Sequence, residues 1–346
     1  MRSTVRLTAL AGLTVSLLAA LPSRDSRACG AFFGVTRDVR RPSLSYEQVL
    51  LVHDDRAGRE HFVRAVTFDG AAQDFGFVVP TPTRPEVASV HSNPFPALRR
   101  TYPYSDPMRR PGGAGGEGIG FGQGHGRLGG GVEVLEQKTV GSFTAFVLQA
   151  DDAQALQGWL AKNKLLASPE AEPWLAHYVR RKFFYVAMKH DATSAERDAK
   201  QPRLQMETVR ISFDTPVPFY PYLEPPAQAG APALGARLLE LWVVTREPVV
   251  PVSLLDDGAS RTWVRPMRQE MVRRPAPFPE HVLEDELSRL LPAGPIAVQT
   301  FQDQKVSRAG YGDVLFARVD PGAAPTDDRR AALRPLLAIL DPELGP

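Results

Sequence analysis

The stretch VLLVHDDRAGREHFVRAVTFDGAAQDFGFVV, residues 49–79, decides the fold of this chain. It contains three short runs rich in valine and phenylalanine, at 49–52, 62–68 and 75–79, which are separated by turn-forming residues. Such runs are typical of β-strands, and short connections join strands that run antiparallel. We therefore predict an antiparallel meander, which Pro80, Pro82 and Pro85 end because proline cannot donate to a hydrogen-bond ladder.

Further strands and several amphipathic helices are expected around this meander. Strand patterns occur at 132–135, 140–148, 183–188, 204–213, 238–245, 296–301 and 314–319. Because strands are grouped before and after the helices and do not alternate with them, we predict an α+β fold. It consists of mainly antiparallel β-sheet with a few amphipathic helices packed on it.

Three helices are expected. The first is capped by Asp151, the second begins between residues 168 and 173, and the third covers 280–291. Each has a stripe of apolar side chains at helical spacing, which we interpret as core packing in preference to a ligand pocket. The stripes are Leu156, Trp159 and Leu160; Trp174, Leu175, Tyr178 and Val179; and Leu283, Leu287, Leu290 and Leu291.

The first 28 residues have the pattern of a secretory signal peptide. Arg2 and Arg6 precede an apolar run at 7–21, which is too short for a transmembrane helix, and small residues favour cleavage between Ala28 and Cys29. We expect an exported protein, periplasmic or secreted, whose mature chain begins at its only cysteine.

A lipid anchor on Cys29 is not expected. A lipidation signal places an aliphatic residue three positions before the cysteine, where this chain has Ser26, and Arg27 is bulky and charged. Later apolar runs do not reach membrane-spanning length either. We therefore predict a soluble mature protein with no transmembrane segment.

Charge restricts the possible partners. The formal net charge of +2 falls to about −1 once the basic signal is removed. A near-neutral chain lacks the broad basic surface that neutralises phosphates, so we expect no nucleic-acid partner. The arginine doublets are interpreted as solvated surface; they are 99–100, 109–110, 273–274 and 329–330.

Composition divides the chain into four parts. Residues 1–28 form the signal, 29–102 a β-rich part, 103–131 a Pro- and Gly-rich loop or linker, and 132–346 an α+β part. The third part has too few apolar residues to offset its chain entropy. We expect the second and fourth to belong to one continuous fold.

Catalytic and metal-binding motifs are not evident. The Gly-x-Gly-x-x-Gly matches that begin at Gly113 and Gly124 are preceded by prolines and arginines and not by a strand, so we predict no dinucleotide site and no cofactor. Acidic groups at 54–55, 256–257 and 284–286 could hide a catalytic carboxylate pair but are interpreted as two turns and a helix face. The histidines have no spacing typical of a metal site; they are His53, His61, His91, His125, His177, His190 and His281.

Three motifs carry a resemblance to a known family. They are ACGAFF at 28–33, DFGFVVPTP at 74–82 and a strand–helix unit over 147–163. In this order they resemble the DUF2330 family of uncharacterised exported bacterial proteins. The chain departs from the family pattern because Gly34 stands where a second cysteine often follows and because it lacks a C-terminal membrane helix. The resemblance implies an exported protein and brings no established activity.

Two hypotheses for function remain. The preferred one is an exported, non-catalytic binding or structural module. The alternative is an N-terminal-nucleophile hydrolase, in which cleavage frees the amino group of Cys29 to act as base for its own thiol. The sequence supplies only that one residue of such a site, so catalytic activity is not expected.

Overall fold

The computed structural model describes residues 31–34, 43–69, 74–103, 131–165, 169–191, 193, 203–225, 237–254, 260–262, 268–272, 275–304, 308 and 312–318. The signal segment, Cys29 and residues 104–130 lie outside these ranges. So do His125 and the acidic pair at 256–257. None of the helices in the described ranges is long and apolar enough to cross a membrane.

The described residues form three β-sheets. The five-stranded sheet has, in spatial order, β1 (Ala31–Gly34), β4 (Phe75–Thr81), β8 (Phe184–His190), β7 (Phe143–Ala150) and β6 (Val132–Val140). The eight-stranded sheet has β15 (Arg268–Val272), β16 (Ala297–Asp303), β12 (Leu238–Thr245), β2 (Ser43–Asp54), β3 (Arg59–Asp69), β10 (Val209–Asp214) and β5 (Glu86–Ser89), with β9 (Arg203–Gln205) beside β3. The four-stranded sheet has β11 (Phe219–Tyr220), β17 (Val314–Arg318), β13 (Val249–Leu254) and β14 (Ser260–Thr262).

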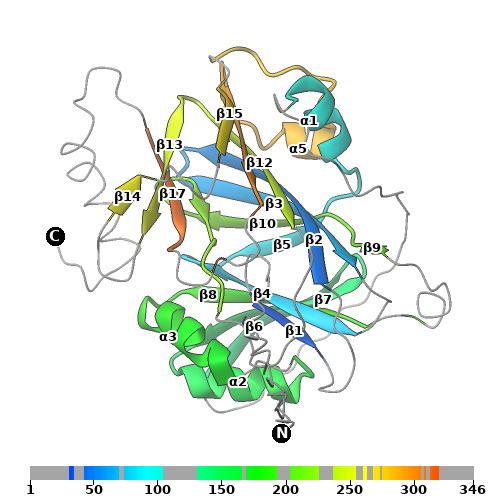
Figure 1. Cartoon of the computed structure of the whole chain (residues 1–346), viewed down its shortest axis with the longest axis vertical. Helices are drawn as coiled ribbons and strands as arrows, with labels where there is room; N and C mark the ends of the chain where they lie inside the picture. The colour runs from blue at the N-terminus through cyan, green and yellow to red at the C-terminus, as the bar shows by residue number, and fades with distance from the viewer. Residues whose placement is uncertain are drawn as a thin grey trace, which may run out of the picture.

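The helices cover the outer faces of the two larger sheets. In Figure 1, α2 (Ala153–Lys162) and α3 (Glu172–Arg180) lie below the five-stranded sheet, whereas α1 (Phe95–Thr101) and the short α5 (Asp285–Ser288) lie beside the eight-stranded sheet at the top. A 3-10 turn at Pro169–Ala171 leads into α3. The fold is therefore rich in antiparallel sheet with few helices, in agreement with the coarse fold class predicted from the sequence.

Two hydrophobic cores hold these layers together. The larger core brings together side chains of all three sheets with those of α2 and α3. The smaller core lies between the outer face of the eight-stranded sheet and α1 and α5, and its centre is Trp242, whose ring is 5.7 Å from that of Phe95. Strands β2 and β3 thus bury both faces, which explains their nearly continuous apolar sequence.

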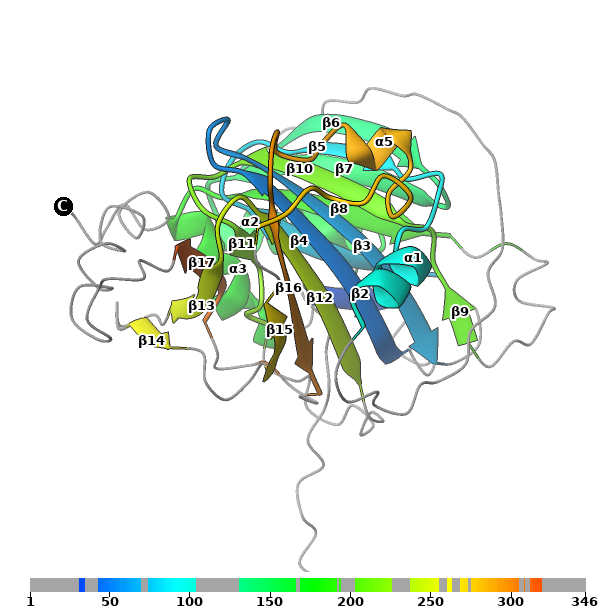
Figure 2. The same cartoon turned by 90° about the horizontal axis from the view of Figure 1, so that it is seen from above.

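The predicted meander is only half right. Strands β2 and β3 form a long antiparallel hairpin, but β4 leaves that sheet and pairs with β1 and β8. Moreover, β2 pairs on its other side with β12 in parallel, as Figure 2 shows. Of the three prolines expected to end this strand, Pro80 lies inside β4, but the strand ends at Thr81, directly before Pro82. The described part of β1 pairs only as far as Val78, so no ladder hydrogen bond to β1 is needed at Pro80.

The helix predicted over 280–291 is wrong in extent. Only Asp285–Ser288 is helical, because Glu284 before it has an extended backbone and Pro279 stands at the start of the preceding turns. Its leucine stripe is still used, since Leu283 and Leu287 are buried in the smaller core.

Several boundaries are shifted as well. The N-cap of α2 is Asp152 and not Asp151; its carboxylate accepts a hydrogen bond from the backbone N–H of Ala155 at 2.6 Å. The strand predicted over 140–148 is interrupted at Gly141, whose φ of 58° makes the turn between β6 and β7. The run 204–213 divides into β9 and β10. The apolar stripes of α2 and α3 are confirmed: Leu156, Trp159, Leu160, Trp174, Leu175 and Tyr178 are buried, and Val179 is partly buried.

Candidate functional site

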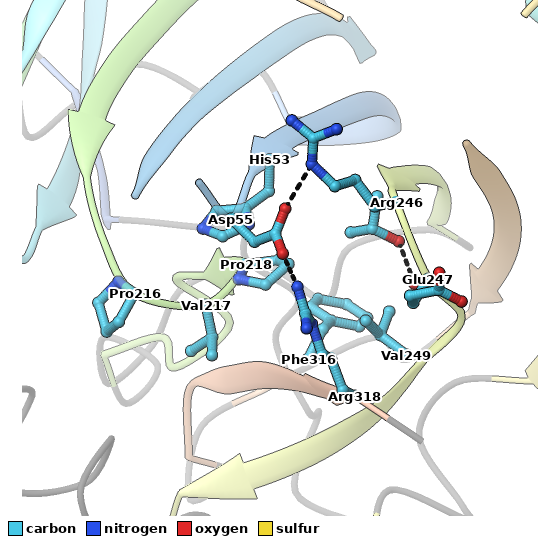
Figure 3. Close-up of a pocket in the computed structure, with 11 residues that line it drawn as sticks. His53, Asp55, Pro216, Val217, Pro218, Arg246, Glu247, Val249, Phe316 and Arg318 are labelled. Atoms are coloured by element: carbon cyan, nitrogen blue, oxygen red, sulfur yellow. Dashed lines mark hydrogen bonds and ion pairs between the residues drawn. The ribbon is translucent and has the colours of Figure 1, made fainter. Parts of the chain in front are cut away.

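A pocket lies where the eight-stranded and four-stranded sheets meet. Its space, counted together with the solvent at its open side, is about 310 Å³. Its floor is largely apolar and its rim carries charged side chains, as Figure 3 shows. The lining residues are His53, Asp55, Pro216, Val217, Pro218, Thr245, Arg246, Glu247, Val249, Phe316 and Arg318. They come from the end of β2, the β10–β11 connection, the β12–β13 turn and β17.

The charges on the rim are bound to one another. Arg246 donates from Nε to Asp55 at 2.7 Å and from Nη2 to Asp54 at 2.8 Å, and its Nη1 donates to the carbonyl oxygen of Ala293 at 2.6 Å. Arg318 forms an ion pair with the other oxygen of Asp55, so Asp55 lies between two guanidinium groups (Figure 3). Burial alone would raise the pKa of Asp54, but its hydrogen bonds, first that from Arg246, lower the pKa below the usual value.

The inner wall of the pocket carries a neutral histidine. His53 is buried, and its Nε2 lies 2.9 Å from the carbonyl oxygen of Thr215, so Nε2 carries the proton and donates. Burial lowers its pKa below the ordinary histidine value. Its cross-strand neighbour Glu60 is also buried; burial raises the pKa of Glu60 well above its usual range although the N–H of Phe219 donates to it at 2.6 Å. Burial therefore favours the uncharged form of both groups.

A second group of charges is buried between the sheets. This group, here called the central ion cluster, consists of Glu47, Arg64, Glu224, Arg237, Asp303 and Arg308, none more than 2% exposed. Arg64 lies on β3 with its guanidinium carbon 4.9 Å from the centre of the Phe77 ring on β4, which places the cluster between the five- and eight-stranded sheets. Buried charges are unfavourable unless they are paired, and here three arginines face three carboxylates.

The ion pairs of the cluster join segments that are distant in the sequence. Arg64 lies 2.8 Å from Glu47 on β2, and Arg237 lies 2.7 Å from Glu224. Arg308 donates from Nε to Asp303 at 3.0 Å, and its Nη1 lies 3.5 Å from Glu47. Burial alone would lower the pKa of the Arg308 guanidinium, but Tyr220, Asp303 and other neighbours together raise it well above its ordinary value, so Arg308 remains charged.

A buried acid beside this cluster connects it to α3. Asp313 accepts hydrogen bonds from the Tyr178 hydroxyl at 2.9 Å and from the backbone N–H of Leu223 at 3.0 Å. Burial raises its pKa to about 7, and these hydrogen bonds oppose that shift. Trp174 of α3 also donates to the carbonyl oxygen of Leu223 at 2.9 Å, so the segment that carries Glu224 is held from both sides.

The histidines that the sequence singled out are dispersed. His53 and His61 lie on neighbouring strands; His61 is hydrogen-bonded to Ser212 at 2.8 Å, and burial lowers its pKa to about 4. His177 and His190 are buried beside aromatic rings, and His91 lies 3.3 Å from Glu286 at the surface. Within the described ranges, no three His, Cys, Asp or Glu residues gather as a metal site.

Of the acidic pair at 54–55, which the sequence placed in a turn, Asp54 is the last residue of β2 and Asp55 begins the turn; Asp55 lines the pocket, and both bind Arg246. Sequence reasoning missed the central ion cluster. A signal was present: Arg64 alternates with Phe62 and Val66, and Glu47 precedes Val49 at the same spacing, so each charge stands on the inner face of a strand. A charge at such a position must find a partner within the fold.

Comparison with protein families shows to which family the chain belongs. A family model described as an uncharacterized protein conserved in bacteria, DUF2330, matches residues 24–264. The chain belongs to the DUF2330 family. This match includes β1 to β14 and most of the pocket, and it confirms the resemblance seen in the three sequence motifs. No curated protein matches this DUF2330 chain.

Similarity to solved structures is distant. The crystal structure of baculovirus P35 is 7% identical to the DUF2330 chain, with a TM-score of 0.36 over 81% of this chain and 98% of the other. A TM-score this low does not establish a shared fold.

Proposed function

We propose that this DUF2330 protein is exported and works outside the cytoplasm as a non-catalytic binding or structural module. Export is supported by the basic, apolar and small-residue pattern of residues 1–28. The absence of cysteine pairs is compatible with this location because the described fold is stabilised by its large cores and buried ion pairs.

The non-catalytic role is inferred from Asp55, whose carboxylate is bound by the guanidinium groups of Arg246 and Arg318. A general base needs a free carboxylate or imidazole whose pKa is near the working pH. Asp55 lies between Arg246 and Arg318, so its carboxylate is already bound, and burial lowers the pKa of the His53 imidazole below its ordinary value. These groups hold three sheet segments together at the pocket and are suited to shaping a surface, not to moving protons.

Cys29 provides the test against the alternative hydrolase. As the only thiol, it can be alkylated selectively with iodoacetamide, and the Cys29→Ser variant measures labelling of other groups. A rate that follows an ordinary thiol pKa of about 8.5, or no reaction at all, supports the module. Rapid labelling below neutral pH would identify an activated thiolate and would overturn the non-catalytic proposal.

Export has a separate test. The intact mass of protein recovered from the extracytoplasmic fraction should match a chain that begins at Cys29 and carries no acyl group. A product that retains residues 1–28, or one found only in the cytoplasm, contradicts export. A mass higher by a diacylglyceryl group contradicts the unanchored form.

A further inference from the structure

The central ion cluster contains more hydrogen-bond donors than its own acceptors use. Nε and Nη1 of Arg237, and Nη2 of Arg308, are buried and have no acceptor in hydrogen-bond geometry within the described part of the chain. Each guanidinium carries five N–H donors. Native proteins satisfy nearly all buried donors with protein, water or bound-ion acceptors, so this part of the cluster is incomplete as it stands.

The free donors belong to neighbouring groups. Arg237 Nη2 lies 2.7 Å and Arg308 Nη1 lies 4.0 Å from the same oxygen, Oε1 of Glu224. The Tyr222 ring centre is 4.6 Å from the guanidinium carbon of Arg308, and Asp303 accepts from Arg308 Nε. These contacts fix the plane of the Arg308 guanidinium group and leave its Nη2 without an acceptor. Two guanidinium groups therefore lie beside the same carboxylate oxygen, and each still has N–H donors without an acceptor.

We propose that Arg237 and Arg308 together bind one small oxyanion inside the fold. Guanidinium groups match the oxygens of carboxylate, phosphate and sulfate with paired N–H donors, which makes this ligand class the complement of the free edge. Because the three arginines of the cluster are already balanced by three carboxylates, a bound anion must be accompanied by a proton. Glu224 is the acceptor for it, since it touches both arginines and burial raises its pKa.

Burial determines how the anion enters. Arg237 is 2% exposed and Arg308 is 0% exposed, so the ion would be enclosed when the chain folds and would exchange slowly afterwards.

The direct test is to purify the protein in buffer free of phosphate, sulfate and carboxylate, unfold it in acid, and analyse the released anions by ion chromatography. One oxyanion per chain is expected. Release of none, or of chloride alone, would overturn the site and leave ordered water as the partner of these donors.

A refolding experiment identifies which oxyanion the site binds. Unfolded protein is refolded in separate samples with phosphate, sulfate, acetate or chloride at equal ionic strength, and retained anion and Tm are measured after gel filtration. At least one oxyanion should be retained and should raise Tm relative to chloride, by an amount that increases as the pH is lowered because Glu224 takes up a proton.

Arg237→Met should abolish retention, whereas Arg318→Met, at the exposed pocket rim, should retain the anion as the unmodified protein does. Equal retention by both variants contradicts the assignment. If Arg237→Met does not fold, the anion count on the unmodified protein still decides whether the site exists. The Cys29 result does not bear on this site, so the two proposals fail independently.

Discussion

At the scale of single residues, Asp313 gives the sharpest prediction, because its environment favours the neutral acid. Its pKa of about 7 in the fold lies above the ordinary value of 3.8. A raised acid pKa contributes stability that is fully present below the unfolded pKa and is lost as the pH rises through the folded pKa. The loss between about pH 4 and pH 7 is on the order of 4 kcal/mol for this group.

Asp313→Asn should remove this loss. The asparagine oxygen can still accept from Tyr178 and Leu223, so the stability of the variant relative to the unmodified protein should increase from pH 4 to pH 7. Urea unfolding at intervals across this range measures it. Asp151→Asn, at an exposed side chain, serves as the control. A constant difference between Asp313→Asn and the unmodified protein would show that Asp313 titrates normally.

Single residues also show where sequence reasoning stops. Asp54 and Asp55 were both predicted as turn residues, which is correct for Asp55, whereas Asp54 is the last residue of β2. Their partner Arg246 lies about 190 positions away and joins them only because β12 lies next to β2. Local patterns contain no information on such long-range pairs, so the pocket could not be assembled from the sequence. The buried charges on β2 and β3 could have been noticed, but not their partners.

At the scale of elements, two glycines should respond in opposite ways to the same substitution. A Cβ on Gly76 in β4 would lie 2.0 Å from Leu165 Cδ2 and 2.6 Å from the carbonyl oxygen of Met188, so the packing must shift. Gly158 is exposed on α2 and a Cβ there would meet nothing within 4 Å. Chemical denaturation should show Gly76→Ala destabilised by about 1–3 kcal/mol and Gly158→Ala stabilised by about 1 kcal/mol. If Gly76→Ala is neutral, β4 does not approach Leu165 this closely.

Helix α2 supplies a test of packing against the five-stranded sheet. Trp159 is buried and its ring centre is 5.2 Å from that of Phe146 in an edge-to-face contact. Trp159→Ala should cost about 3–5 kcal/mol in the free energy of unfolding, whereas Gln154→Ala on the exposed face should change little. An unchanged stability for Trp159→Ala would mean that the side chain contacts a partner and not the core.

Elements with a strong local signal were predicted well. The runs that became β3, β12 and β16, and the stripes of α2 and α3, have clear periodicity and were identified close to their bounds. The 280–291 segment failed because a leucine stripe reports burial and not backbone conformation: Leu283 and Leu287 are buried although only one helical turn forms. The pairing of β12 with β2 had no local signal at all.

At the scale of the whole molecule, buried titratable groups set the response to pH. Burial raises the pKa values of Glu60, Glu224 and Asp313, so their contributions decline as the pH rises. Burial lowers the pKa values of His53 and His61, so their contributions are lost as the pH falls below about 6.5. The two effects oppose each other only in the acidic range.

The unfolding free energy of Glu60→Gln should therefore decrease less steeply from pH 5 to pH 6 than that of the unmodified protein, since the amide cannot ionise in the unfolded chain. Calorimetry or urea titration in buffers of constant ionic strength measures the two slopes. Equal slopes for the two proteins would show that Glu60 remains charged in the fold.

The parallel pairing of β2 with β12 has a consequence for the order in which the chain can fold. The two strands register Tyr46 with Leu238 and Val52 with Val244, so the centre of the eight-stranded sheet closes only after nearly two hundred residues of intervening chain are available. Contacts of such large sequence separation slow folding and leave hydrophobic strand edges open in the meantime. Until β12 has been synthesised, the β2–β3 hairpin has one edge of β2 unpaired, and during this interval that edge is open to association with other chains.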